Sequence, residues 1–181
     1  MPGLLVIGLG NVLMGDDAFG PFVVQALDAG YALGPEVTAR DLGTPGLDLV
    51  PYLMGTPALI VVDTVQAEGA PGELRLYRRA ELLARPPAPR LNPHEPGLAE
   101  TLVTLELLGG APREVLLVGA IPECVRTGIG LSPALVAAAP RAVLAVLAEL
   151  ARLGHPAPPR ERPLATAPWW LTPPEPLRAH A

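Results

Sequence analysis

The fold of this chain is decided near its N-terminus, by the stretch Leu4-Leu5-Val6-Ile7-Gly8-Leu9-Gly10-Asn11-Val12-Leu13-Met14-Gly15-Asp16-Asp17. Residues 4–7 form a short, continuous apolar run that ends in glycine, which is typical of a buried parallel strand. A helix is predicted to follow, from residue 18 or 20 to residue 29. Pro21 limits where this helix begins, because proline lacks an N–H group and only the first turn of a helix can spare one. Asp17 is therefore predicted to lie in the first turn or at the N-cap.

Other segments extend this strand-and-helix pattern along the chain. The apolar runs Ala58–Val62 and Val115–Ile121 predict two more buried strands, whereas alternation over 36–42 and 73–77 predicts more exposed strands. Helices are predicted over 47–54 and 96–108. A third helix should open at Ser132-Pro133, with the serine as N-cap and the proline in the first position, and Pro140 should kink or restart it.

Strands separated by helix-length segments predict an α/β fold. We expect a three-layer α/β/α domain with a mostly parallel, twisted sheet of about five strands. The strand over 4–7 should be central, with the strand over 58–62 beside it and the strand over 73–77 antiparallel at an edge. The strands over 4–7 and 58–62 then flank a topological switch point, where open α/β sheets bind ligands.

Length and composition restrict the class of protein. The 181 residues predict one domain over residues 1–153 and a proline-rich tail over 154–181, mostly extended or disordered, in which Trp169-Trp170 either find a partner surface or are simply exposed. The net charge of −5 argues against a nucleic-acid binder, and a single cysteine, Cys124, excludes an intramolecular disulfide. Charged residues interrupt the apolar stretch 131–153, and the N-terminus lacks the basic start of a signal peptide. We therefore expect no membrane span and a cytoplasmic location.

Three side chains are expected at the carboxyl edge of the sheet: Asp17, Asp63 and His94. Two carboxylates and an imidazole suit a divalent metal of intermediate hardness. Each residue also has a simpler interpretation, since aspartate caps helices and neither a strand-end aspartate nor a loop histidine requires a ligand. The presence of all three at one edge favours a site.

The glycines Gly8-x-Gly10 after a strand also suggest dinucleotide binding. That fingerprint needs a third glycine where this chain has Leu13, so a tight strand-to-helix turn is favoured. Cys124 has no base predicted beside it and is interpreted as a small core residue rather than a nucleophile. A non-enzymatic α/β module that binds a metal or a nucleotide stays open as an alternative.

Taken together, the motifs resemble those of the endopeptidases that mature NiFe hydrogenases. The resemblance rests on the segments Gly8–Gly20, Gly43-Thr44-Pro45-Gly46, Val62-Asp63, Pro93–Leu98 and Val118–Glu123. Their order and spacing match the family over about residues 3–153. Pro96 departs from the usual family pattern after His94-Glu95, and the tail exceeds the usual family core.

The resemblance implies a protease that removes a C-terminal extension from the hydrogenase large-subunit precursor after nickel insertion. Family metal-binding positions map onto Asp17, Asp63 and His94, and the nickel would arrive in the substrate, with zinc or cadmium able to replace it in crystals. The positive end of the helix beside Asp17 predicts modest affinity for free metal. Two points stay open: whether the metal is catalytic or only recognised, and whether Asp16 or Asp63 is the hydrolytic base.

Overall fold

The computed structural model describes residues 3–45, 49–84, 97–164 and 168. Its centre is a five-stranded sheet with the strand order β2-β1-β3-β5-β4. The strands are β1 (Leu4–Leu9), β2 (Val37–Gly43), β3 (Ala58–Thr64), β4 (Leu74–Arg78) and β5 (Glu114–Ala120). All pairs are parallel except β4 with β5, which is antiparallel at one edge. The predicted α/β class and the antiparallel edge strand are both confirmed.

Strand β1 lies between β2 and β3. Leu4 pairs with Val37 of β2 on one side and with Ala58 of β3 on the other, and the pairing with β3 continues to Gly8 opposite Val62. The chain therefore steps from β1 outward to β2 and then back across β1 to β3. This confirms the predicted switch point between the strand that leads to Asp17 and the strand that contains Asp63.

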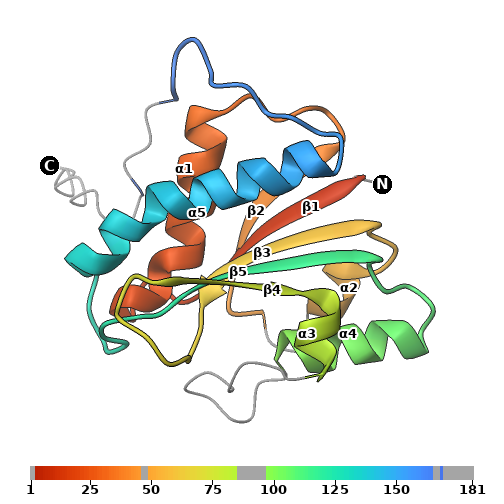
Figure 1. Ribbon diagram of the computed structural model, residues 1–181, viewed down its shortest axis with the longest axis horizontal. Helices are drawn as coiled ribbons and strands as arrows, with labels where there is room; N and C mark the ends of the chain where they lie inside the picture. The colour runs from red at the N-terminus through yellow and green to blue at the C-terminus, as the bar shows by residue number, and fades with distance from the viewer. Residues whose placement is uncertain (1–2, 46–48, 85–96, 165–167, 169–181) are drawn as a thin grey trace, which may run out of the picture.

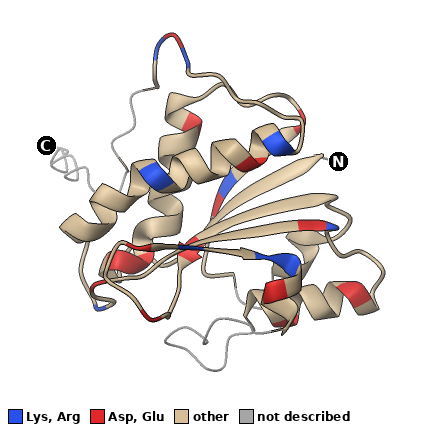
Figure 2. Cartoon of the chain, viewed as in Figure 1, with Lys and Arg blue, Asp and Glu red and all other residues tan. Residues whose placement is uncertain are grey.

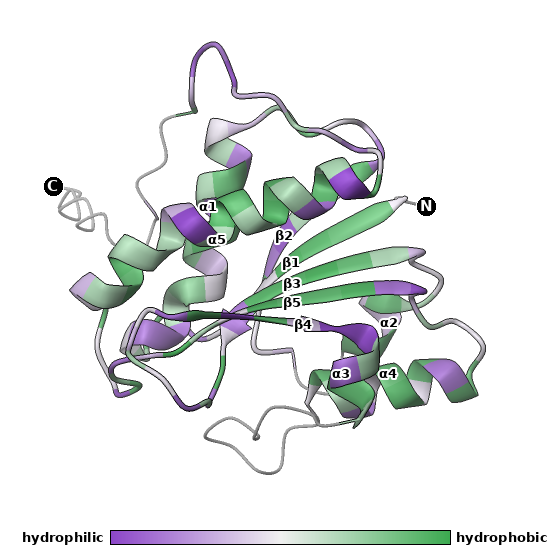
Figure 3. Ribbon diagram, viewed as in Figure 1, coloured by the Kyte–Doolittle hydropathy of each residue, from purple (hydrophilic) through white to green (hydrophobic). Residues whose placement is uncertain are grey.

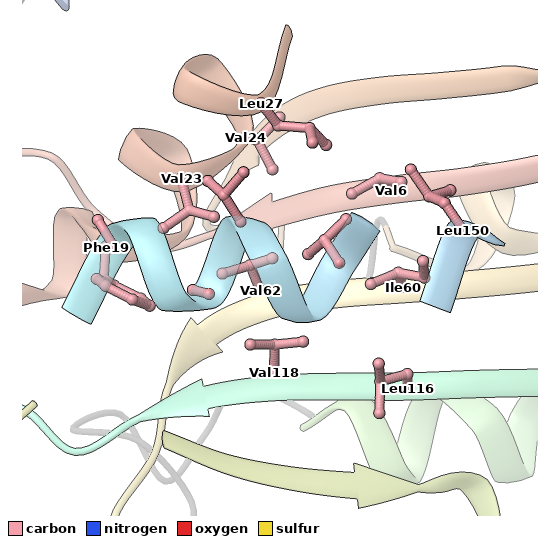
Figure 4. Packing of buried hydrophobic residues seen from close by; sticks show 14 of the residues in the cluster. Val6, Phe19, Val23, Val24, Leu27, Ile60, Val62, Leu116, Val118 and Leu150 are labelled. Atoms are coloured by element: carbon pink, nitrogen blue, oxygen red, sulfur yellow. The ribbon is translucent and has the colours of Figure 1, made fainter. Parts of the chain in front are cut away.

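Helices cover both faces of the sheet (Figure 1). One face is covered by α1 (Phe19–Gly30) and α5 (Pro133–Arg152), and the other by α2 (Leu49–Leu53), α3 (Arg79–Ala84) and α4 (Leu98–Leu107). Successive strand residues point to opposite faces, so an inner strand covered on both sides is apolar along its length (Figure 3). In β3, Ile60 and Val62 pack in the cluster under α1 and α5 (Figure 4), while Leu59 and Val61 pack in the cluster on the other face.

Helix α5 begins as predicted. The Ser132 hydroxyl accepts a hydrogen bond from the Leu135 N–H at 3.4 Å, and Pro133 takes the first helical position. The predicted restart at Pro140 is wrong, because the helix is continuous to Arg152. An internal proline costs about 3 kcal/mol, and the larger burial of Leu135, Val146 and Leu150, at roughly 1.5–3 kcal/mol each, offsets this cost.

The length and apolarity of α5 are those of a membrane span, and no other helix of the described ranges reaches them. The helix packs against α1, β3 and β5, with Leu135, Val146 and Leu150 fully buried there. Core packing therefore accounts for its apolar face, in agreement with the predicted amphipathic helix.

Helix α3 was not predicted from the sequence. Its start is fixed by the Arg78 N–H, which donates to the Glu81 carboxylate at 2.7 Å, and Leu82 is its buried residue. Because only one of its six residues is buried, α3 shows no helical periodicity of apolar residues that could predict it.

The first part of the predicted tail packs back onto the domain. The Arg160 N–H donates to the Gly30 carbonyl at 2.8 Å, and the Leu164 N–H donates to the Ala29 carbonyl at 3.0 Å. Ala157 packs against the core cluster under α1 and α5. Residues 155–164 form no helix or strand, and they contact the end of α1, whereas Trp169 and Trp170 lie outside the described residues.

Candidate active site

Glycines bring the start of α1 into close contact with the sheet. A Cβ atom on Gly20 would lie 2.3 Å from the Leu9 carbonyl oxygen and 2.4 Å from the Val62 carbonyl oxygen, distances at which real atoms collide. A Cβ atom on Gly8 would lie 2.4 Å from the Gly20 carbonyl oxygen. Gly10 has a φ of +141°, and a Cβ there would lie 1.8 Å from the Asp17 carbonyl oxygen. Close backbone packing therefore explains Gly8 and Gly10 without a nucleotide.

Asp17 lies in a 3-10 turn, η1 (Gly15–Ala18), immediately before α1. Its Oδ2 atom accepts a hydrogen bond from the Asn11 N–H at 2.8 Å, and its Oδ1 atom accepts one from the Thr64 hydroxyl at 3.1 Å. The N-cap of α1 is Ala18, which makes no side-chain cap. Asp17 thus lies in the first turn of the helical segment that starts at Gly15 and runs into α1, as predicted, but its carboxylate caps no helix and contacts the β1–η1 loop and β3 instead.

Asp63 lies near the carboxyl end of β3, where it is 8% exposed. Its Oδ1 atom accepts a hydrogen bond from the Thr64 N–H at 2.5 Å. Thr64 thus donates to both predicted site carboxylates, with its backbone to Asp63 and with its hydroxyl to Asp17. Acidic residues gather where the carboxyl ends of the strands meet the start of α1 (Figure 2).

Asp16 lies beside Asp17 but has a different environment. It is 1% exposed, and its Oδ2 atom accepts from the N–H groups of Glu123 and Cys124 at 2.8 and 3.0 Å. Its Oδ1 atom accepts from the N–H of Ser132, the N-cap of α5, at 2.6 Å. These three bonds fix the loop between β5 and α5 to the turn that carries Asp17. The arrangement favours a structural role for Asp16 over the predicted role of hydrolytic base.

The segment before Asp16 is bonded to the same loop through its backbone. The Gly15 N–H donates to the Gly128 carbonyl and the Gly128 N–H to the Leu13 carbonyl, each at 2.9 Å. Cys124 is half-buried and donates its N–H to Asp16, so it contributes to the loop through its backbone rather than as a core side chain.

The third predicted ligand, His94, lies in residues 85–96, outside the described residues. In the ranges that are described, no group of three or more His, Cys, Asp or Glu side chains could hold a metal ion. Convergence of His94 with Asp17 and Asp63 therefore stays a prediction. The structure brings Asp17 and Asp63 to the same edge of β1 and β3, each in contact with Thr64.

The sequence patterns did not single out Thr64. Its contact with Asp17 joins residues 47 positions apart, and a polar residue at a strand end has no special periodicity. Thr64 directly follows Asp63 at the end of a strand, and it faces the loop after the first strand. This position is the signal that could have identified it.

Comparisons with known proteins agree with this arrangement. The family model described as hydrogenase maturation protease matches residues 21–149. The chain is 38% identical over 159 residues to the hydrogenase 2 maturation protease of Escherichia coli (strain K12), which covers 87% of this chain and 96% of that protein.

Two solved structures are similar over most of the chain. Hydrogenase maturating endopeptidase HybD from Escherichia coli matches with a TM-score of 0.80 and 37% identity, over 87% of this chain and 97% of that one. Hydrogenase 2 maturation peptidase from Thaumarchaeota archaeon SCGC_AB-539-E09 matches with a TM-score of 0.63 and 36% identity, over 82% and 97%. These matches confirm the resemblance seen in the motifs. The chain therefore belongs to the hydrogenase maturation protease family, and it is a peptidase.

Proposed function

We propose that this protein is the endopeptidase that removes the C-terminal extension of a NiFe hydrogenase large-subunit precursor after nickel insertion, with Asp17, Asp63 and His94 recognising the nickel in the substrate. The observation that carries the proposal is the position of Asp17 and Asp63. They lie at the carboxyl edge of β1 and β3, at the switch point, and both accept hydrogen bonds from Thr64. Relatives named as hydrogenase maturation proteases support the substrate class.

The donor set is compatible with a nickel ion carried by the substrate. Carboxylate oxygens tolerate most divalent ions, and imidazole is a common ligand of nickel. If the nickel ion is coordinated by this protein and by the precursor together, this protein would bind a precursor without nickel poorly. Such dependence would make cleavage follow nickel insertion, and zinc or cadmium could take the same position in a crystal of the free protein.

Hydrolysis adds one water molecule across the scissile peptide bond. The water oxygen bonds to the carbonyl carbon, the C–N bond breaks, and a proton passes to the leaving amine. A base near the scissile bond must accept the water proton. Asp16 has three backbone N–H donors on its carboxylate and is almost fully buried, so we assign the role of base to Asp63.

The non-enzymatic binding module that the sequence left open is not adopted. The family is a peptidase family, and the glycines that suggested a nucleotide are explained by backbone packing at Gly8, Gly10 and Gly20. We place the processing reaction in the cytoplasm, with the large-subunit precursor as the partner and no nucleic acid or membrane involved.

The test is mass spectrometry of the precursor after incubation with this protein. Wild-type protein should shorten the nickel-loaded precursor by its C-terminal extension and leave the nickel-free precursor intact. Asp63→Asn and His94→Ala should each lower the cleavage rate by about 100-fold or more, since one catalytic group typically contributes 10²–10⁴-fold. Both variants should keep the melting temperature of the wild type within a few degrees.

Asp28→Asn is the matched control for the charge change, because Asp28 lies at the far end of α1 from this edge. It should cleave at the wild-type rate. Full cleavage by both Asp63→Asn and His94→Ala would exclude these residues as the site, and cleavage of nickel-free precursor at the same rate would exclude nickel recognition.

A further inference from the structure

Thr64 contacts both carboxylates of the proposed site. Its N–H donates to Asp63 Oδ1 at 2.5 Å and its hydroxyl donates to Asp17 Oδ1 at 3.1 Å. The two aspartates lie on different elements, η1 and β3, and are 46 positions apart in the chain. One residue therefore connects two groups that the sequence holds apart.

The local geometry restricts the Thr64 hydroxyl to one direction. Thr64 is the last residue of β3, it is 6% exposed, and it pairs with Ala120 of β5. Successive strand residues point to opposite faces, so Thr64 points toward the α1 side while Asp63 points toward the other. A buried threonine has a restricted χ1 angle because its Cβ atom is branched. The hydroxyl is thus a rigid donor aimed at the turn that carries Asp17.

The other oxygen of Asp17 is held by a second donor. Asp17 Oδ2 accepts the Asn11 N–H at 2.8 Å, from the loop after β1. One donor lies in the loop after β1 and the other is the last residue of β3, so the segments that flank the switch point hold both oxygens of the carboxylate. The Asn11 donor is a backbone group and cannot be removed by a simple substitution, whereas the Thr64 donor is a side chain.

We propose that Thr64 is a positioning residue of this peptidase: it orients the Asp17 carboxylate and sets its spacing from Asp63, without contacting the substrate. This inference rests on the proposed function of Asp17 and Asp63. Hydrogen-bond partners of metal ligands typically change metal affinity or activity by 10–100-fold when they are removed. Thr64 is expected to act in the same way on recognition of nickel by Asp17.

The experiment compares Thr64→Val, Thr64→Ala and Thr64→Ser with the wild type. Valine keeps the shape of threonine and removes the hydroxyl, alanine removes both, and serine keeps the hydroxyl. Two readouts are needed: binding of Ni²⁺ alone by isothermal titration calorimetry, and kcat and KM for cleavage of nickel-loaded precursor. The matched control is Thr56→Val, since Thr56 is also buried, at 5% exposed, and lies before the opposite end of β3.

We expect Thr64→Val and Thr64→Ala to weaken Ni²⁺ binding by about tenfold or more and to lower kcat/KM by a similar factor. Thr64→Ser should lie within about threefold of the wild type, because it keeps the donor. Thr56→Val should match the wild type in both readouts. A purely structural role would instead lower the melting temperature of the valine variant and leave its kcat, its KM and its Ni²⁺ affinity unchanged below that temperature.

Wild-type kcat/KM in both Thr64→Val and Thr64→Ala would overturn the inference, and so would equal losses in Thr64→Val and Thr64→Ser. Asp17→Asn separates this failure from that of the proposed function. If Asp17→Asn abolishes cleavage while Thr64→Val does not, the site stands and the positioning role of Thr64 falls. If Asp17→Asn cleaves normally, the proposed site itself is wrong.

Discussion

At the scale of single residues, two adjacent aspartates have opposite tasks. Asp17 presents its carboxylate at the edge between β1 and β3, and Asp16 turns away into the protein. A buried carboxylate is costly unless hydrogen bonds stabilise its charge. Three backbone N–H groups do so for Asp16, and the same bonds fix the loop between β5 and α5 to η1. The site edge is therefore supported by a buried carboxylate that three backbone N–H groups hold in place.

Asp16→Asn should destabilise the fold by about 1.5–3 kcal/mol, the range for hydrogen bonds to a charged group. Asparagine offers a single acceptor oxygen, so its amide NH₂ would face the N–H of Ser132 or those of Glu123 and Cys124. Urea unfolding measures the loss, with the exposed Asp28→Asn as control. Unchanged stability together with complete loss of cleavage would instead make Asp16 the hydrolytic base.

At the scale of elements, ion pairs connect α5 with β4 and β5 away from the candidate site. The carboxylate of Glu149 in α5 is 4% exposed and contacts Arg78 of β4 at 2.5 Å and Arg152 at 2.8 Å. Arg152 also contacts Glu114 of β5 at 2.5 Å. Burial by itself would raise the pKa of Glu149, but the hydrogen bonds from Arg152 and Arg78 outweigh it and lower the pKa from 4.5 to about 2.

This shift predicts a specific dependence of stability on pH. Because the folded-state pKa of Glu149 is below the unfolded value, its contribution is fully present above about pH 4.5 and is lost as the pH falls toward 2. Glu149→Gln should therefore be less stable than wild type at pH 7, and the difference should shrink as the pH falls through this window. The urea concentration at the unfolding midpoint, measured for both proteins between pH 7 and pH 2.5, checks this prediction.

Glu68→Gln is the control for this measurement, because Glu68 is exposed on the surface. Its pH dependence should run parallel to that of the wild type. A constant difference between Glu149→Gln and wild type at every pH would show that the side chain contributes by packing and not through its charge.

At the scale of the whole molecule, the segment after α5 completes the far end of α1. The last carbonyls of a helix have no partner within the helix. Here the carbonyls of Asp28, Ala29 and Gly30 accept hydrogen bonds from Arg160 and Leu164, and the Ala32 N–H donates to the Pro158 carbonyl at 2.8 Å. Residues 155–164 therefore contribute to the fold, although they follow the last helix.

Truncation after Gly154 should lower the melting temperature by about 2–12 °C, as expected for a loss of about 1–3 kcal/mol in a chain of this size. Truncation after Leu164 keeps these hydrogen bonds and should melt close to the full chain. Thermal unfolding followed by circular dichroism compares the three. If all three chains have the same melting temperature, the folded unit ends at residue 153.

The sequence by itself determined the α/β class, the interior position of β1 beside β3, the antiparallel β4 and the start of α5. Each of these depends on apolar periodicity or on glycine, proline and serine at fixed local positions, and such signals act over a few residues. It also placed Asp17 and Asp63 at one sheet edge, because parallel strands share their carboxyl ends.

Only the tertiary structure decided the contacts of Asp16, Thr64 and residues 155–164. Their partners lie far along the chain: Thr64 is 47 positions from Asp17, and Asp16 is 107 to 116 positions from its three donors. A hydrogen bond needs its donor and acceptor within about 3 Å, and that proximity arises only when the sheet and its helices have packed. No local pattern records it, so the fully buried Asp16 and the partly buried Asp17 look identical until the chain is folded.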